Sequence, residues 1–183
     1  MIPLILLALG LAMDAFSVSV SFGVCHPKSK IDSALRLAFF TALFQTMMPL
    51  FGWIIGNIIG NVFFKGSYCI AFIILLGIGI KMIIDAIIKK EDCNPIDISK
   101  GKHLIIVCLA TSIDALAAGL SLGILKTNLL LSISMIGIIT FILSFTGIYF
   151  GKIAGFLLGK WAEITGGIIL ISIGINIVLR NFF

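Results

Sequence analysis

The sequence contains few charged residues. Only 11% of its 183 residues are Asp, Glu, Lys or Arg, whereas about 25% is usual for a soluble globular protein. Hydrophobic residues make up 60% of the chain, and the mean hydropathy is +1.24. This balance excludes a water-soluble domain of ordinary composition and indicates an integral membrane protein.

Several motifs that carry chemistry in other proteins are also absent. The four Cys and two His residues show neither CxxC nor HxxxH spacing, which argues against a zinc or dithiol site. There is no GxxxxGK[ST] loop, so we expect no nucleotide site and no transport driven by ATP within this chain. The net charge of +5 comes from lysines in short loops rather than from a basic face, and we expect no nucleic-acid partner.

Six apolar segments are present, each close to the roughly 20 residues that a helix needs to cross a bilayer. They cover residues 2–24, 34–59, 68–88, 103–125, 127–150 and 163–181. Polar or turn-forming residues separate them at 25–33, 63–68, 89–102, 125–128 and 159–163. We therefore predict one all-α integral membrane domain, 1–183, with six transmembrane helices.

The two halves of the chain resemble each other. The Asp-Ala pairs at Asp14 and Asp114 are one hundred residues apart, and the matches extend to Ser21 with Ser121, Gly23 with Gly123, Gly52 with Gly147 and Gly56 with Gly151. "LLGIGIKMI" at 75–83 likewise matches "LISIGINIV" at 170–178. Residues 1–88 and 103–183 thus form two three-helix repeats, joined by a cytoplasmic linker at 89–102. Because three is odd, the second repeat must be inverted, which is typical of secondary transporters.

The lysines and arginines predict the orientation in the membrane. Nine follow the first, third and fifth spans, namely Lys28, Lys30, Arg36, Lys89, Lys90, Lys100, Lys102, Lys152 and Lys160. Three lie on the other side, namely Lys65, Lys126 and Arg180. Positive loops stay in the cytoplasm, so we expect both termini outside it.

Asp14 and Asp114 are the only ionisable residues inside the first span and the core of the fourth. At 1.5 Å per residue they lie roughly 18 Å and 16 Å from opposite faces, near the middle of a core of about 30 Å. A lone aspartate there is costly, and such residues are usually functional.

Two facing carboxylates repel, and a divalent cation would cancel that repulsion. Oxygen ligands favour magnesium, calcium or manganese. The competing interpretation is that each Asp only locks helix packing through hydrogen bonds to serine or backbone.

Other polar residues in the spans are secondary candidates. Gln45, Thr140 and Asn176 could supply neutral oxygen ligands at suitable depth. Lys81 and Asp85 are four residues apart and are expected to form an ion pair on one helix face. Nearby methionines are expected to be packing residues, although a thioether beside a carboxylate would favour manganese over magnesium.

Four motifs point to a known family: "MDAFSVSVSFG", "FQTMMPLFGWIIG", "GIGIKMIIDAI" and "ATSIDALAAGLSLG". Together they resemble the bacterial MntP family of manganese efflux pumps, part of the lysine-exporter superfamily of six-helix proteins with two three-helix repeats. The resemblance implies manganese(II) export across the bacterial cytoplasmic membrane, with Asp14 and Asp114 essential. It also implies an acidic third-span residue, here Asp85, and places Gln45 where some members have Glu. Asp14, Asp114, Gln45, Asp85 and Asn176 are therefore our candidate metal ligands.

Several functional alternatives remain at this stage. The chain could export another divalent cation or an amino acid, or act as a membrane assembly factor that transports nothing. An intramembrane aspartyl protease also uses two membrane aspartates, but its Tyr-Asp and Gly-x-Gly-Asp motifs are absent. We therefore expect no enzyme and no cofactor, with manganese as the transported substrate. Proton-coupled antiport, a facilitated exit path and assembly into homo-oligomers are all compatible with the sequence.

Overall fold

The structure is a computed structural model that describes residues 2–62, 67–88, 93, 98–125, 127–154 and 157–182. These residues form six α-helices: α1 (Ile2–Cys25), α2 (Ile31–Val62), α3 (Ser67–Ile88), α4 (Gly101–Ile124), α5 (Leu129–Ala154) and α6 (Leu157–Phe182). Each helix is long and apolar enough to cross a membrane. Within the described ranges there is no strand, so the predicted all-helical membrane protein is confirmed.

The helix boundaries differ from the sequence prediction chiefly in α6 and α2. The helix α6 begins at Leu157, so the predicted break at 159–163 is wrong. Gly159 packs against Ser17, and Lys160 and Trp161 are exposed, so this polar stretch is an amphipathic first turn and not a loop. The helix α2 has 32 residues and is roughly 48 Å long, well beyond the hydrocarbon core. Parts of three other predicted breaks, at 63–66, at 89–92 and 94–97, and at 126, lie outside the described residues.

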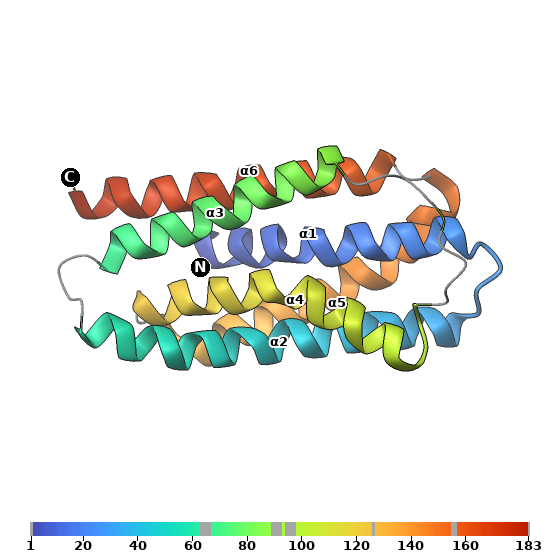
Figure 1. The fold of residues 1–183 in the computed structure, drawn as a ribbon, viewed down its shortest axis with the longest axis horizontal. Helices are drawn as coiled ribbons and strands as arrows, with labels where there is room; N and C mark the ends of the chain where they lie inside the picture. Colours follow the sequence, from blue (N-terminus) through green and yellow to red (C-terminus); the bar gives the residue numbers. More distant parts are fainter. Residues whose placement is uncertain are drawn as a thin grey trace.

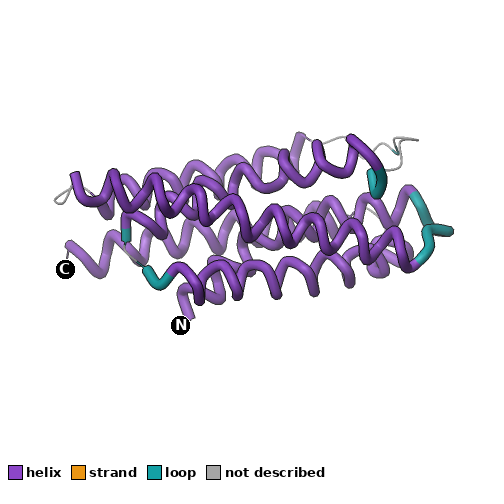
Figure 2. Tube along the Cα trace, turned by 90° about the horizontal axis from the view of Figure 1, so that it is seen from below, coloured by secondary structure: helices purple, strands orange, loops and turns teal. Residues whose placement is uncertain are grey.

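The six helices form an elongated bundle in which α1 begins and α6 ends toward the same end (Figure 1, Figure 2). Helices at equivalent places in the two halves run in opposite directions, as α1 and α4 do in Figure 1. The neighbours of α1 are chiefly α5 and α6, and those of α4 are chiefly α2 and α3. Each of these two helices therefore packs mainly against the opposite half of the chain.

Glycines allow α2 to touch α4, and α5 to touch α1, at backbone distance. A methyl group at any of these glycines would overlap backbone or ring atoms of the facing helix. The contacts are Gly52 with Leu116, Gly56 with Leu120, Gly147 with Phe16, and Gly151 with Val20. Close approach through small residues is the usual way that membrane helices associate. The glycine pairs that matched in sequence therefore make matching contacts. The pair in α2 contacts α4, and the pair in α5 contacts α1, so each pair meets the first helix of the opposite half.

Covalent and polar contacts join the helices at the other end of the bundle. Cys25 at the end of α1 forms a disulfide with Cys93, which follows α3. At the end of α5, Lys152 Nζ donates a 3.1 Å hydrogen bond to the Ser29 carbonyl. The loop after α1 is thereby attached both to the segment between the halves and to α5.

Candidate functional site

Asp14 and Asp114 lie at the centres of their helices. In the apolar span Leu4–Cys25, ten residues precede Asp14 and eleven follow it. In the span Gly101–Ile124, thirteen residues precede Asp114 and ten follow it. Asp114 is buried, with 6% of its surface exposed, whereas Asp14 is half-buried. Both carboxylates therefore lie deep in the bundle, far from either end of their helices.

Lys81 of α3 is the direct partner of Asp114. Its Nζ donates to Oδ1 of Asp114 at 2.7 Å, and this is a charge-assisted hydrogen bond. Half of the lysine side chain is exposed, so it reaches inward from the edge of the bundle to a carboxylate that is 9% exposed. Asp14 and Asp85 also interact electrostatically with Lys81. The structure thus places one candidate ligand, Asp114, in direct contact with Lys81, and Asp14 and Asp85 near enough to act on its charge.

The ion pair that we expected between Lys81 and Asp85 is replaced by the pair between Lys81 and Asp114. Spacing along α3 favoured Asp85, but α4 packs against α3 and presents a more buried carboxylate. Among the described residues, no three His, Cys, Asp or Glu side chains converge closely enough to hold a metal ion. In this arrangement the positive charge beside Asp114 is supplied by the protein itself.

Gln45 of α2 lies one helical turn from Asp14. Its Nε2 donates a 3.2 Å hydrogen bond to the carbonyl of Leu11, three residues before Asp14. Only 1% of its surface is exposed, and its Oε1 is buried without a hydrogen-bond partner among the described residues. Thr140 occupies the matching place in α5, and its buried hydroxyl likewise lacks a partner there. Both side chains therefore hold neutral oxygens inside the bundle.

Asn176 is not brought into this group. Its side chain is exposed on α6, six residues beyond Leu170, which contacts Gly10 of α1. Counting residues gave Asn176 a plausible depth, but depth does not determine which face of a helix a residue occupies. The structure places the other four candidate ligands in or beside the bundle interior and leaves Asn176 on its surface.

Glu163 is a buried carboxylate that the sequence analysis did not select. It is 1% exposed, and its Oε1 accepts a 2.6 Å hydrogen bond from Ser17, three residues after Asp14 on α1. It was missed because the sequence analysis assigned residues 159–163 to a loop. A signal was nonetheless present, because Gly159, Glu163 and Gly166 share one face of α6 at helical spacing.

Two methionines lie close to these polar residues. Gly166 of α6 is in contact with both Met13 and Met82, each of which adjoins a site residue in sequence. Met82 belongs to the largest hydrophobic core cluster, and Met13 packs against that cluster. The methionines therefore serve as packing residues next to the carboxylates, as expected.

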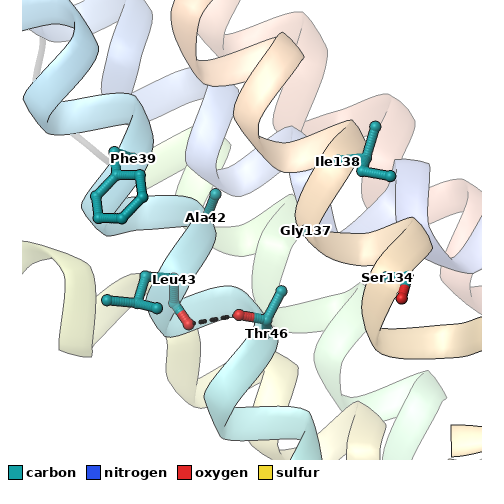
Figure 3. Close-up of a pocket in the computed structure, with 7 residues that line it drawn as sticks. All are labelled: Phe39, Ala42, Leu43, Thr46, Ser134, Gly137 and Ile138. Carbon is teal, nitrogen blue, oxygen red and sulfur yellow. Dashed lines mark hydrogen bonds between the residues drawn. The ribbon is translucent and has the colours of Figure 1, made fainter. Parts of the chain in front are cut away.

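A shallow groove of about 350 Å³ lies elsewhere, between α2 and α5 (Figure 3). Apolar and small residues line it, including Phe39, Leu43 and Gly137, and the hydroxyl of Thr46 donates to the Leu43 carbonyl. None of its lining residues is charged. It therefore offers no cation site comparable to the carboxylates around Lys81.

Comparison with known proteins gives a consistent result. Residues 28–178 match the family model Mntp, described as "Putative manganese efflux pump". A Crocosphaera subtropica protein named "Putative manganese efflux pump MntP" is 46% identical, over 96% of this chain and 93% of that protein. Proteins of the same name from Ruminiclostridium cellulolyticum and Clostridium perfringens are 44% and 39% identical, over 98% of this chain and 96% and 94% of their own lengths. No solved structure matches the chain.

Proposed function

This chain belongs to the Mntp family of manganese efflux pumps, and we propose on that basis that it exports manganese(II) across the cytoplasmic membrane. The relatives are named as efflux pumps, and a pump is a transporter and not an enzyme. Six apolar helices provide the multi-pass membrane body that such transport needs. The observation that carries the proposal is the placement of Asp14 and Asp114 at the centres of α1 and α4, each of which packs against the opposite half of the chain.

The charges at this site suit a divalent cation. Asp14, Asp85 and Asp114 contribute three negative charges when ionised, and Lys81 contributes one positive charge, which leaves a formal charge of minus two. A group of carboxylates with a net negative charge is costly inside a membrane. One manganese(II) ion would neutralise it, and the buried oxygen of Gln45 could join the shell. Manganese is then the transported substrate, and the protein needs no resident cofactor.

We further propose that the halves form an inverted repeat with both termini outside the cytoplasm. The antiparallel course of α1 and α4 and the matching glycine contacts support the repeat. The nine Lys and Arg residues on one side support the orientation. In this orientation the Cys25–Cys93 bond faces the cytoplasm, where thiols are kept reduced, so we expect it to be open in the cell and to form on oxidation.

Transport would be secondary in this mechanism. Carboxylates that release a cation can take up protons in its place. Exchange of manganese for protons would therefore let the site turn back toward the cytoplasm without bare charges. Alternating access between two halves around a central site is the usual way in which inverted repeats move a substrate.

The test is expression in a manganese-sensitive bacterium. We expect the protein to lower the cellular manganese content under manganese stress and to restore growth. Cellular cobalt, zinc, iron and magnesium, measured in the same samples, distinguish manganese export from export of another divalent cation. Unchanged manganese in cells whose membranes contain the intact protein would overturn the proposal.

A further inference from the structure

Lys81 is the unexpected member of this site. A cation exporter needs carboxylates, yet here an ammonium group already lies 2.7 Å from Asp114, within the electrostatic reach of Asp14 and Asp85. A metal ion bound to the same Asp114 oxygen would meet that ammonium group at close range. Two positive charges a few ångströms apart repel strongly where water is scarce. Lysine and metal therefore compete for the Asp114 carboxylate.

We propose that Lys81 is a tethered cation, which occupies the Asp114 carboxylate in the unloaded protein and is displaced when the transported cation binds. This inference rests on the proposed cation export and adds a residue to the same site.

The two partners differ in freedom to move. Asp114 is 9% exposed and fixed by a short side chain in the middle of α4, whereas half of the Lys81 side chain is exposed. Lysine carries its charge on a flexible stem of four carbons, so the ammonium group can swing while α3 stays in place. Long side chains of this kind extend readily toward the nearest polar region. The lysine is therefore the partner that leaves.

Asp85 provides a second position for the displaced ammonium group. It follows Lys81 by four residues on α3, a spacing at which oppositely charged side chains meet on one helix face. It is half-buried, lies one turn nearer the proposed cytoplasmic end, and already interacts electrostatically with Lys81. Lys81 thus has two partners, Asp114 in the unloaded protein and Asp85 in the loaded one.

The exchange keeps the Asp114 carboxylate paired with a positive charge in both states. With a divalent cation bound, Asp14 and Asp114 neutralise the cation, while Lys81 and Asp85 neutralise each other. After release, the return of Lys81 to Asp114 avoids leaving a bare, buried carboxylate, which would be costly in a membrane. The lysine would therefore help the empty protein to return to the conformation that binds a cation from the cytoplasm. It would also compete with the incoming cation for Asp114.

The first test is manganese(II) binding to purified protein in lipid nanodiscs, measured by titration calorimetry. Removing the competitor by Lys81→Met should tighten binding by about tenfold or more relative to the wild type. Lys81→Arg keeps the charge and should bind about as the wild type does. Lys152→Met is the matched control, because Lys152 contacts Ser29 at the end of the bundle. Unchanged or weaker binding by folded Lys81→Met would overturn the proposal, since a lysine that only supports structure cannot weaken binding by its presence.

The second test separates net transport from exchange in proteoliposomes. Lys81→Met should lose about nine-tenths or more of net manganese efflux, because the empty protein returns without its own cation. It should still exchange internal for external radioactive manganese, since exchange never requires the empty state to return. Equal loss of both activities would overturn the proposal.

The third test uses Asp85→Asn and keeps the proposal testable if Lys81→Met fails to fold. Loss of the second position should weaken manganese binding by about threefold or more in a protein that retains Lys81. Unchanged binding by Asp85→Asn would overturn the proposal. In the Lys81→Met background the same change should have little effect, and a persisting loss would make Asp85 a ligand and refute its role as acceptor.

The outcomes distinguish the two levels of inference. Wild-type protein that neither binds nor transports manganese would refute the proposed function. Wild-type protein that transports manganese, with Lys81→Met binding it no more tightly, would refute only the role of Lys81.

Discussion

The hydroxyl of Ser17 in α1 donates a 2.6 Å hydrogen bond to Glu163 in α6, and both residues are buried. Ser17 lies one turn beyond Asp14, toward the proposed cytoplasmic end of α1. Glu163 therefore places a carboxylate between the cytoplasm and the central aspartates. A cation that enters from the cytoplasm would meet this carboxylate before it meets Asp14.

Glu163→Gln should accordingly slow manganese export by about tenfold or more. The amide oxygen can still accept the Ser17 hydrogen bond, so the variant should fold while losing the negative charge. Export is measured as the initial rate of manganese loss from preloaded cells. Lys160→Gln, exposed on the same turn of α6, is the control. Wild-type rates in Glu163→Gln would show that the carboxylate is structural.

Asp14→Asn and Asp114→Asn should each abolish export while leaving the protein inserted in the membrane. Asparagine keeps the size and much of the hydrogen bonding of aspartate but removes the charge that a divalent cation requires. The readouts are cellular manganese and the amount of protein in the membrane fraction. Full resistance to manganese in either variant would mean that its carboxylate serves packing alone.

Gly56→Ala should reduce the yield of folded protein severely. The added methyl group would overlap the Leu120 carbonyl oxygen and force α2 away from α4. Gly77→Ala in α3 is the matched control, because a methyl group there meets nothing within 4 Å. Size-exclusion profiles and thermal unfolding of the two purified variants make the comparison. Equal behaviour would show that α2 and α4 tolerate a wider separation.

Gln45→Glu should change manganese affinity or its pH dependence, whereas Asn57→Asp should be nearly neutral. Gln45 is buried one turn from Asp14, where an added charge must be balanced by the bound cation or by a proton. Asn57 is half-buried nearer the end of α2, where water screens a new charge. Binding titrations at several pH values test both. Similar effects at the two positions would place Gln45 away from the bound cation.

Tags placed at residues 1, 95 and 183 should report outside, inside and outside. This pattern follows from the excess of Lys and Arg after α1, α3 and α5. Protease accessibility in intact and permeabilised cells measures it. A tag at residue 183 that is protected in intact cells would contradict the proposed orientation.

The sequence predicted those features that depend on local pattern. Hydropathy and length placed six helices, and counting from the span ends centred Asp14 and Asp114, because both rest on neighbouring residues in the chain. The partner of Lys81 could not be predicted in this way. Spacing indicated Asp85, but the lysine pairs with Asp114, thirty-three residues away, once α4 packs on α3.

Glu163 and Asn176 show the same limit from opposite directions. Glu163 looked like a loop residue beside Gly159 and Lys160, and only its contact with Ser17 reveals a buried carboxylate. Asn176 had the right depth, but the face of α6 on which it lies is set by packing against α1 and α3. Side-chain direction within a bundle depends on tertiary pairing, which a single sequence does not display.

The crossed packing of the halves has a consequence for biosynthesis. Among the described residues, α1, α2 and α3 touch one another little, because each packs on helices of the second half: α1 on α5 and α6, α2 on α4 and α5, and α3 chiefly on α6. A nascent chain that has inserted only its first three helices therefore has almost no helix–helix interface to form. Those helices therefore remain separate spans in the lipid until the second half of the chain has been synthesised and inserted. Assembly is then a late event, in which Gly52 and Gly56 meet α4 and α1 is enclosed by α5 and α6.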